Sequence, residues 1–355
     1  MNKKVLPLLP LVLLALLLAL WTGLIRMGWQ LPLSRGVADH GALMAGSFLG
    51  SLIIIERAVV LKKLWSYTIP AINLLSLPLF LFGYPLIAYG CLVAGSLGLM
   101  LIFWLLLQRQ SDASMWVMLC GAACWLIGNV LLLQHDLYPM AVFWWVLFLL
   151  LTISGERLEL TRFLPITSKQ KCLLYAALLL GVAGVLMPYH SSGRWVLGAG
   201  LIGTASWLFR FDIARKTAKK QGLPAFGGRA LLLGYGWLLV CGVLLFSYDT
   251  LPLMYDAVLH AFFLGFVFSM IFAHGPIILP AVAGLSTKPY HPFLYLPLAL
   301  LQLSLAIRIG ADVFLWIEWR KWSGILSGVA ILFYFTGIVL ILIHERSKRT
   351  AKVVA

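Results

Sequence analysis

The sequence predicts an all-α membrane protein, a polytopic transmembrane bundle of about twelve helices. Hydrophobic residues make up 62% of the 355 residues and charged residues only 11%. The mean hydropathy is +0.98, and a soluble domain with so few polar side chains could not cover its surface. Apolar runs long enough to cross about 30 Å of hydrocarbon also recur along the whole chain.

The first apolar run, residues 5–24, follows Lys3 and Lys4 in the manner of a signal peptide. It is long enough to span a bilayer and has no small-residue cleavage site after it, so we expect it to be retained as the first helix. Eleven further runs follow, at residues 40–60, 65–83, 86–108, 113–134, 139–157, 171–188, 194–212, 227–248, 255–275, 291–311 and 322–344.

The third and fourth spans are separated only by the sequence Gly83-Tyr84-Pro85, which interrupts a long apolar run. Glycine and proline are the residues that most often punctuate helices, so this tripeptide predicts a turn. The longest connection, residues 216–228, is short and basic. We therefore expect one integral membrane domain, residues 1–355.

A weak internal repeat suggests three four-helix units, at about residues 1–110, 111–220 and 221–355. His40 and His260 would then occupy equivalent places in the first and third units. Adjacent Glu-Arg pairs at 56–57, 156–157 and 345–346 close three of the helices. Opposite charges are ordinary at helix ends, so these pairs are weak evidence for duplication.

The basic residues orient the chain. If the amino terminus is cytoplasmic, an even number of spans returns the carboxyl terminus to the same side. All but six of the 27 Lys and Arg residues then face the cytoplasm; the six are Arg26, Arg35, Arg194, Arg308, Arg320 and Lys321. This positive-inside bias predicts that both termini are cytoplasmic, and it explains the net charge of +15 without nucleic acid.

Hydrolase and ATPase functions are not supported by the sequence. The five cysteines lie in or beside apolar runs with no CxxC spacing, so neither disulfides nor a thiolate metal site is predicted. No Walker-type loop, GxSxG or HExxH is present. Four aspartates are expected at helix ends rather than as paired carboxylates: Asp212, Asp249, Asp256 and Asp312.

The seven histidines fall into two layers. The outer layer comprises His40, His135, His190 and His260, and the inner layer comprises His274, His291 and His344. Neutral imidazole suits iron, copper and zinc, and an ionisable group in a membrane span is a candidate functional residue. For His260 and His274 the alternative, on spacing alone, is a pair of interfacial histidines bonded to neighbouring backbone.

The tenth span carries two of these histidines. His260 and His274 would lie about 21 Å apart along the helix and only about 40° apart around it. Gly275-Pro276 follows His274 directly, and we expect it to break the helix there. A metal site formed by His274, His291 and His344 competes with plain interfacial placement.

His40 and His260 form the best pair, because each enters its helix just inside the outer boundary and is followed by small residues. Small residues let a flat macrocycle lie between helices, so we expect these histidines to be the axial ligands of a b-type haem. Arg308 and Arg320 are candidate partners for its propionates, or parts of a basic and aromatic interfacial belt. His135 and His190 could bind copper, or simply be solvated.

Three long segments resemble the NnrS family: HGALMAGSFLGSLIIIERAV (His40–Val59), FLLLTISGERLELTRF (Phe148–Phe163) and HAFFLGFVFSMIFAHGPIILPAV (His260–Val282). They cover about a sixth of the chain. Members of that family are twelve-helix bacterial membrane proteins that hold haem and copper, are associated with the nitric oxide response in denitrifiers, and are distantly similar to subunit I of haem-copper oxidases. The resemblance implies a location in the bacterial inner membrane, with nitric oxide or another diatomic molecule as a ligand.

The oxidase likeness also implies that histidines on the second and tenth helices hold the low-spin haem. The chain departs from the oxidase pattern, since Phe143-Trp144-Trp145 occupies the sixth span and the seventh ends at the lone His190. The copper-haem dinuclear centre is thus absent or rebuilt, and oxygen or nitric oxide reduction is not supported. The alternative function is a twelve-helix secondary transporter, and a scaffold or assembly role is a third. The sequence does not indicate an oligomeric state.

Overall fold

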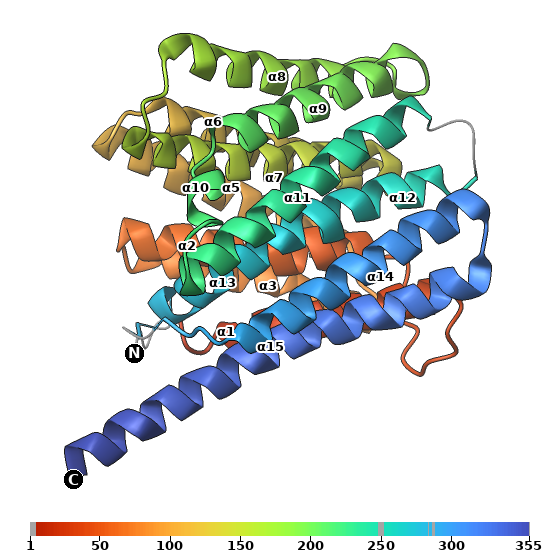
Figure 1. Cartoon of the computed structure of the whole chain (residues 1–355). Coiled ribbons are helices and arrows are strands. Elements are labelled where there is room, and N and C mark those ends of the chain that lie inside the picture. Colours follow the sequence, from red (N-terminus) through yellow and green to blue (C-terminus); the bar gives the residue numbers. More distant parts are fainter. Residues whose placement is uncertain (1–4, 248–251, 283, 286–287, 355) are drawn as a thin grey trace. The chain divides into compact units, whose positions relative to one another are not determined.

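The computed structural model describes residues 5–247, 252–282, 284–285 and 288–354, which form helices and no strand (Figure 1). Lys3, Lys4 and Asp249, named above, lie outside these residues. Within them, 11 helical segments are long and apolar enough to cross a membrane. Each of the 11 corresponds to a predicted span. The predicted span at 194–212 also forms a helix, but it is not among the 11.

The chain divides into two compact units. The amino-terminal unit comprises Met1–Glu159 with Val282–Gly284, and the carboxyl-terminal unit comprises Leu160–Ala281 with Leu285–Ala355. Three four-helix units stay a prediction, because contacts alone do not test an internal repeat.

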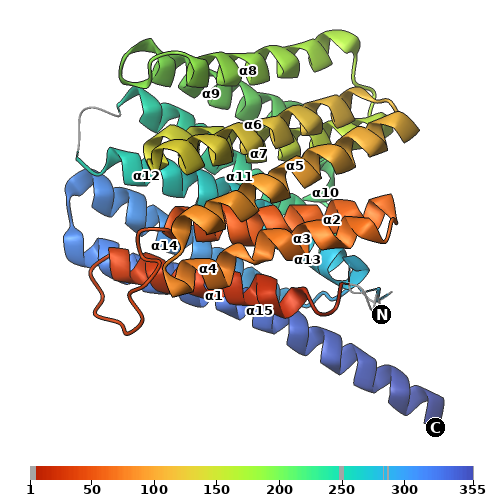
Figure 2. The ribbon, with the colours of Figure 1, turned by 180° about the vertical axis from the view of Figure 1, so that it is seen from behind.

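The amino-terminal unit is built from helices, which Figure 2 shows from behind. Its elements are α1 (Leu9–Arg26), η1 (Ala42–Gly50), α2 (Ser51–Leu61), η2 (Trp65–Tyr67), α3 (Thr68–Leu74), α4 (Ser76–Phe82), α5 (Pro85–Arg109), α6 (Ala113–His135) and α7 (Tyr138–Leu160). In its core the Trp125 ring stacks on Phe148, with 4.8 Å between ring centroids.

The turn between α4 and α5 lies where the sequence predicts it. Gly83 ends α4 with φ 83°, a left-handed conformation that glycine adopts at little cost. Pro85 then occupies the first turn of α5, where its missing N–H removes no helical hydrogen bond. These two residues explain why one continuous apolar run forms two spans.

The carboxyl-terminal unit begins after η3 (Thr161–Phe163). Its elements are α8 (Ser168–Leu186), η4 (Tyr189–Gly193), α9 (Arg194–Phe211), α10 (Ala214–Thr217), α11 (Gly222–Phe246), α12 (Met254–His260), η6 (Ala261–Val267), α13 (Phe268–Val282), η7 (Pro292–Leu294), α14 (Tyr295–Phe314) and α15 (Ile317–Val354). Within this unit α8 packs beside α9, and α14 packs beside α15 (Figure 1).

Glycines let α9 approach both of its neighbours closely. A Cβ atom added to Gly200 would lie 2.5 Å from the Gly181 backbone nitrogen on α8, and one added to Gly198 would lie 2.8 Å from the Gly242 carbonyl oxygen on α11. Small residues are typical of helix interfaces in membranes. Glycine, alanine, serine and the arginines near both ends make α9 less apolar than the other predicted spans.

The predicted break after His274 is wrong, because α13 continues through Pro276 to Val282. A proline at this position leaves the carbonyl of Phe272 without its usual helical donor. The Tyr334 hydroxyl of α15 donates to that carbonyl at 2.8 Å, and the Tyr334 ring stacks on Phe272. Gly275 makes room for this contact, since its added Cβ would lie 2.3 Å from the hydroxyl oxygen.

Replacing Tyr334 with phenylalanine is expected to lower the free energy of unfolding by about 1–3 kcal/mol. The substitution keeps the ring but leaves the Phe272 carbonyl buried without a donor. Unfolding by sodium dodecyl sulfate in mixed micelles measures the loss. A loss no larger than that of Tyr84→Phe, at an exposed position, would contradict this role.

Candidate functional site

His40 lies at the start of the second span, and its ring packs against α1. The Nδ1 atom is 2.8 Å from the carbonyl oxygen of Ala19, which can only accept a hydrogen bond. In the neutral ring the proton is therefore on Nδ1 and the lone pair is on Nε2. Gly23 accommodates the ring, because an added Cβ would lie 2.9 Å from His40 Cε1.

A π-helical segment, η1, begins two residues after His40, and all its residues are buried. Such segments are rare and are frequent at functional sites. Asn73 from α3 supports it by donating to the Gly46 carbonyl oxygen at 3.0 Å and to Ser51 Oγ at 2.8 Å. The geometry after His40 is therefore fixed by a buried side chain from a neighbouring helix.

The small residues after both histidines are covered by side chains of their own units. An added Cβ on Gly46 would lie 2.6 Å from Leu92, one on Gly50 would lie 2.2 Å from Trp125, and one on Gly265 would lie 2.4 Å from Trp237. These glycines therefore pack against large side chains, and space for a macrocycle beside the histidines stays a prediction.

A carboxylate and tyrosine cluster lies next to His40. Asp39 Oδ1 accepts hydrogen bonds from the hydroxyls of Tyr89 and Tyr138, each at 2.9 Å. Tyr89 is also 3.0 Å from Asp136 Oδ1, beyond the end of α6. These groups connect the start of the second span to α5, α6 and α7.

His260 ends α12 and, like His40, has its Nδ1 atom beside a backbone carbonyl, here one of its own helix. Its Nδ1 atom is 2.8 Å from the Asp256 carbonyl oxygen, so the neutral ring again has its lone pair on Nε2. Another π-helical segment, η6, follows immediately. Two histidines in separate units thus share one hydrogen-bond pattern and one kind of helix distortion.

A buried charge cluster, which we call the arginine-aspartate cluster, surrounds the base of His260. Arg308 binds Asp256 Oδ2 through Nε at 3.0 Å and through Nη2 at 2.5 Å, and its Nε is 3.4 Å from Asp312 Oδ2. Arg320 binds Asp312 Oδ1 at 2.9 Å and Asp256 Oδ2 at 3.3 Å. Two positive charges are thus balanced by two negative charges.

The arginines expected to bind propionates are therefore engaged with aspartates of the chain. The expectation that Asp256 and Asp312 would not be paired is corrected, because Arg308 and Arg320 join them. Part of this cluster could have been found in the sequence. Asp256 and His260, like Arg308 and Asp312, are four residues apart, and this spacing places the two residues of each pair on one helix face. The contact with Arg320 depends on how α14 and α15 pack.

Two of the three Glu-Arg pairs also meet. Arg57 binds Glu156 of α7 and lies 3.2 Å from Glu56 in the same span. The Arg57 guanidinium also lies over the Phe103 ring, 5.7 Å from its centroid. This ion pair joins α2 to α7, with the Arg57 side chain buried and that of Glu156 partly exposed. It is therefore a contact between helices as well as interfacial charge at a helix end.

The inner histidines differ in chemistry. His274 Nδ1 is 2.8 Å from the Met270 carbonyl oxygen, so its neutral ring resembles those of His40 and His260. His291 Nδ1 instead accepts from the Phe293 backbone N–H at 3.1 Å, which puts the ring proton on Nε2. His344 lies exposed on α15.

The two outer loop histidines are exposed. His135 is the last residue of α6, and His190 lies in η4 with its ring edge-on to Tyr189. Among the described residues, no group of three or more His, Cys, Asp or Glu side chains is arranged to hold a metal ion. A haem iron with two axial imidazoles requires no such group from the protein.

These features define the class: an all-helical chain whose helices suit a multi-pass membrane protein, with buried polar clusters at helix ends. A family model described as a domain of unknown function (DUF8744) matches residues 5–343, so the chain belongs to that family. No curated protein matches the chain. No solved structure matches it either.

Proposed function

We propose that this chain is a haem-binding protein of the bacterial inner membrane, in which His40 and His260 each supply an imidazole to haem b iron. The observation that carries the proposal is their shared arrangement. Each ring donates from Nδ1 to a backbone carbonyl, and each histidine lies within two residues of the start of a π-helical segment. Axial histidines need the lone pair on Nε2 and a fixed ring orientation.

The donor chemistry fits haem at both residues. Haem bound through two histidines supplies one-electron transfer, and a diatomic ligand such as nitric oxide binds if one imidazole is displaced. Asp256 and Arg308 would hold His260 in position. Asp256 Oδ1 lies 3.4 Å from His260 Nδ1, and Arg308 binds Asp256 Oδ2. The resemblance to NnrS proteins supports a role in nitric oxide tolerance or redox metal handling.

Copper is a second proposed metal, bound at either His135 or His190, whose rings are exposed to solvent. The proposed orientation, with both termini in the cytoplasm, derives from the distribution of basic residues. Fusions of a reporter that folds only in the cytoplasm to the carboxyl terminus test this orientation.

The haem proposal predicts a coloured protein. Purified wild-type protein is expected to show a Soret band and, after reduction, sharp visible bands of a low-spin b-type haem. His40→Ala and His260→Ala are each expected to lose most of the haem, because an iron ligand is removed. His344→Ala, at an exposed position on α15, is the matched control and is expected to keep the wild-type spectrum.

Equal retention of haem by the two variants and the control would contradict the assignment. A colourless wild-type protein, at matched expression and with a monodisperse elution profile, would instead favour the alternative of a secondary transporter. Addition of nitric oxide to the reduced protein tests whether an axial ligand can be displaced, since displacement shifts the Soret band.

A further inference from the structure

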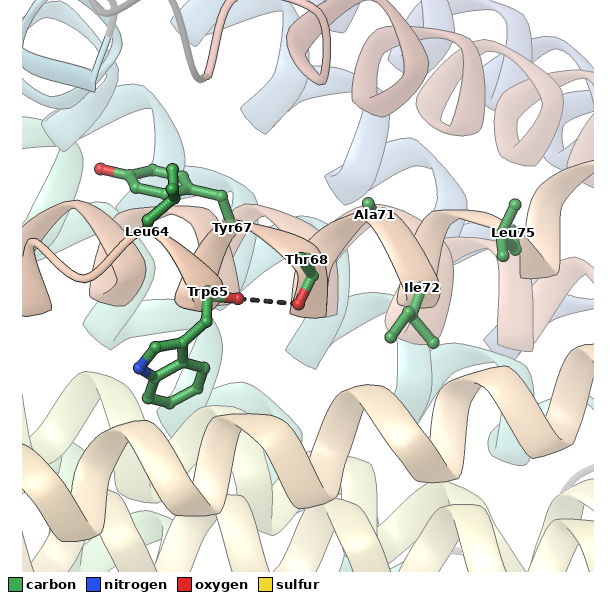
Figure 3. Close-up of a pocket in the computed structure, with 7 residues that line it drawn as sticks. All are labelled: Leu64, Trp65, Tyr67, Thr68, Ala71, Ile72 and Leu75. Carbon is green, nitrogen blue, oxygen red and sulfur yellow. Dashed lines mark hydrogen bonds between the residues drawn. The ribbon is translucent and has the colours of Figure 1, made fainter.

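An apolar groove runs along η2 and α3 in the amino-terminal unit, at the start of the third predicted span. Its lining side chains lie between Leu64 and Leu75, and Figure 3 shows them along one stretch of helix. Leu64, Ile72 and Leu75 are exposed. The Thr68 hydroxyl donates to the Trp65 carbonyl oxygen at 2.7 Å, so the groove presents almost no polar group.

The groove has the length of a lipid chain. From Leu64 to Leu75 a helix rises about 16 Å, and one leaflet of a bilayer with a hydrocarbon core of about 30 Å is about 15 Å thick. Trp65 lies at the end where the span begins, and tryptophan is enriched at the level of lipid headgroups.

Three exposed cations gather at that end. Lys62 and Lys63 immediately precede the groove, and Arg109 from the end of α5 donates to the Leu61 carbonyl oxygen at 3.0 Å. The nearby Asp112 carboxylate accepts from the Ala113 N–H and the Ser114 hydroxyl at the start of α6. Positive charge therefore predominates beside the groove entrance.

The lysine loop is held in a fixed conformation. The buried Ser66 hydroxyl donates to the Lys63 carbonyl oxygen at 2.7 Å, and the Lys62 N–H donates to the Ala58 carbonyl oxygen at 3.1 Å. Lys62 ends α2 with φ 59°, a left-handed conformation that glycine adopts more easily. A strained residue that carries a charge is a reason to look for a function of that charge.

From the groove, its length and the fixed cations at one end, we propose that this surface binds an anionic phospholipid. The acyl chain lies along Leu64–Leu75, and Lys62, Lys63 and Arg109 bind the phosphate and the anionic headgroup. Basic residues near a membrane surface attract anionic lipid. The site is independent of haem, because it includes neither His40 nor His260.

Native mass spectrometry with matched acyl chains tests the proposal, using phosphatidylglycerol and phosphatidylcholine as probes. The wild-type protein is expected to retain phosphatidylglycerol preferentially. The double variant Lys62→Gln/Lys63→Gln is expected to bind phosphatidylglycerol about tenfold or more weakly, with phosphatidylcholine unchanged. Lys219→Gln/Lys220→Gln, another pair of adjacent exposed lysines, is the control and is expected to bind as the wild type does.

A variant within the groove tests binding of the acyl chain separately from binding of the headgroup. Ala71→Phe fills the groove and is expected to weaken both lipids several-fold. Three results would overturn the proposal: equal wild-type binding of the two lipids, loss of phosphatidylglycerol in the control variant as large as in the Lys62/Lys63 variant, or unchanged binding by Ala71→Phe.

Discussion

Replacing Arg308 with methionine is expected to lower the free energy of unfolding by about 3–5 kcal/mol, the cost typical of breaking a buried ion pair by removing one partner. The Asp312 side chain is fully buried and that of Arg308 is 4% exposed. The substitution would leave Asp256 and Asp312 with Arg320 as the only remaining cation of the arginine-aspartate cluster. Denaturation by sodium dodecyl sulfate in mixed micelles measures the change.

Two further variants make the Arg308 result specific. Arg308→Lys keeps the charge but cannot bind Asp256 through two nitrogens, so we expect an intermediate loss. Arg215→Met, at an exposed arginine of α10, is expected to change the stability by less than about 0.5 kcal/mol. If Arg308→Met and Arg215→Met had equal effects, the cluster would contribute nothing to stability.

Replacing Gly184 with leucine is expected to separate α8 from α9 and to cost about 3 kcal/mol or more. A Cβ atom at Gly184 would lie 2.3 Å from the Leu197 backbone nitrogen and 2.7 Å from the Gly193 carbonyl oxygen. Backbone atoms cannot turn aside as a flexible side chain can, so the helices themselves must move. The same denaturation measurement, together with the yield of monodisperse protein, reports the loss.

Gly328→Leu is the matched control for Gly184→Leu. It lies on α15 in the same unit, and a Cβ atom there meets nothing within 4 Å. Leucine has a higher helix propensity than glycine, so this variant should be neutral or slightly stabilising. A similar loss in both variants would show that the added side chain, rather than the close approach of α8 and α9, lowers stability.

The positions of the helices were predictable because apolar length and Gly-Pro punctuation are local signals. Gly83 and Pro85 divided a continuous apolar run correctly, and the span at 194–212 formed as α9. Pro276 led to the wrong prediction of a helix break. The donor to the Phe272 carbonyl is the hydroxyl of Tyr334, which is far along the chain. No local pattern reveals such a donor.

The surroundings of the candidate site were only partly predictable. The sequence singled out His40 and His260, but the backbone acceptor of His40 comes from α1 through Ala19, which no spacing indicates. The sequence indicates only the parts of the arginine-aspartate cluster that lie within single helices, through four-residue spacings. Its closure by Arg320 depends on packing of α14 and α15, which requires the folded chain.

The direction in which each histidine side chain points depends on the number of residues in the π-helical segment beside it. A π-helical turn takes up one more residue than an α-helical turn, and each residue of an α-helix advances the side-chain direction by about 100°. If one residue were deleted from Ala42–Gly50 and the segment became an α-helix, the His40 side chain would keep its direction around the helix axis relative to Arg57. A substitution that converted the segment to an α-helix without a deletion would rotate the His40 side chain away from that direction. The direction of His40 is therefore kept only if the number of residues and the helix type change together.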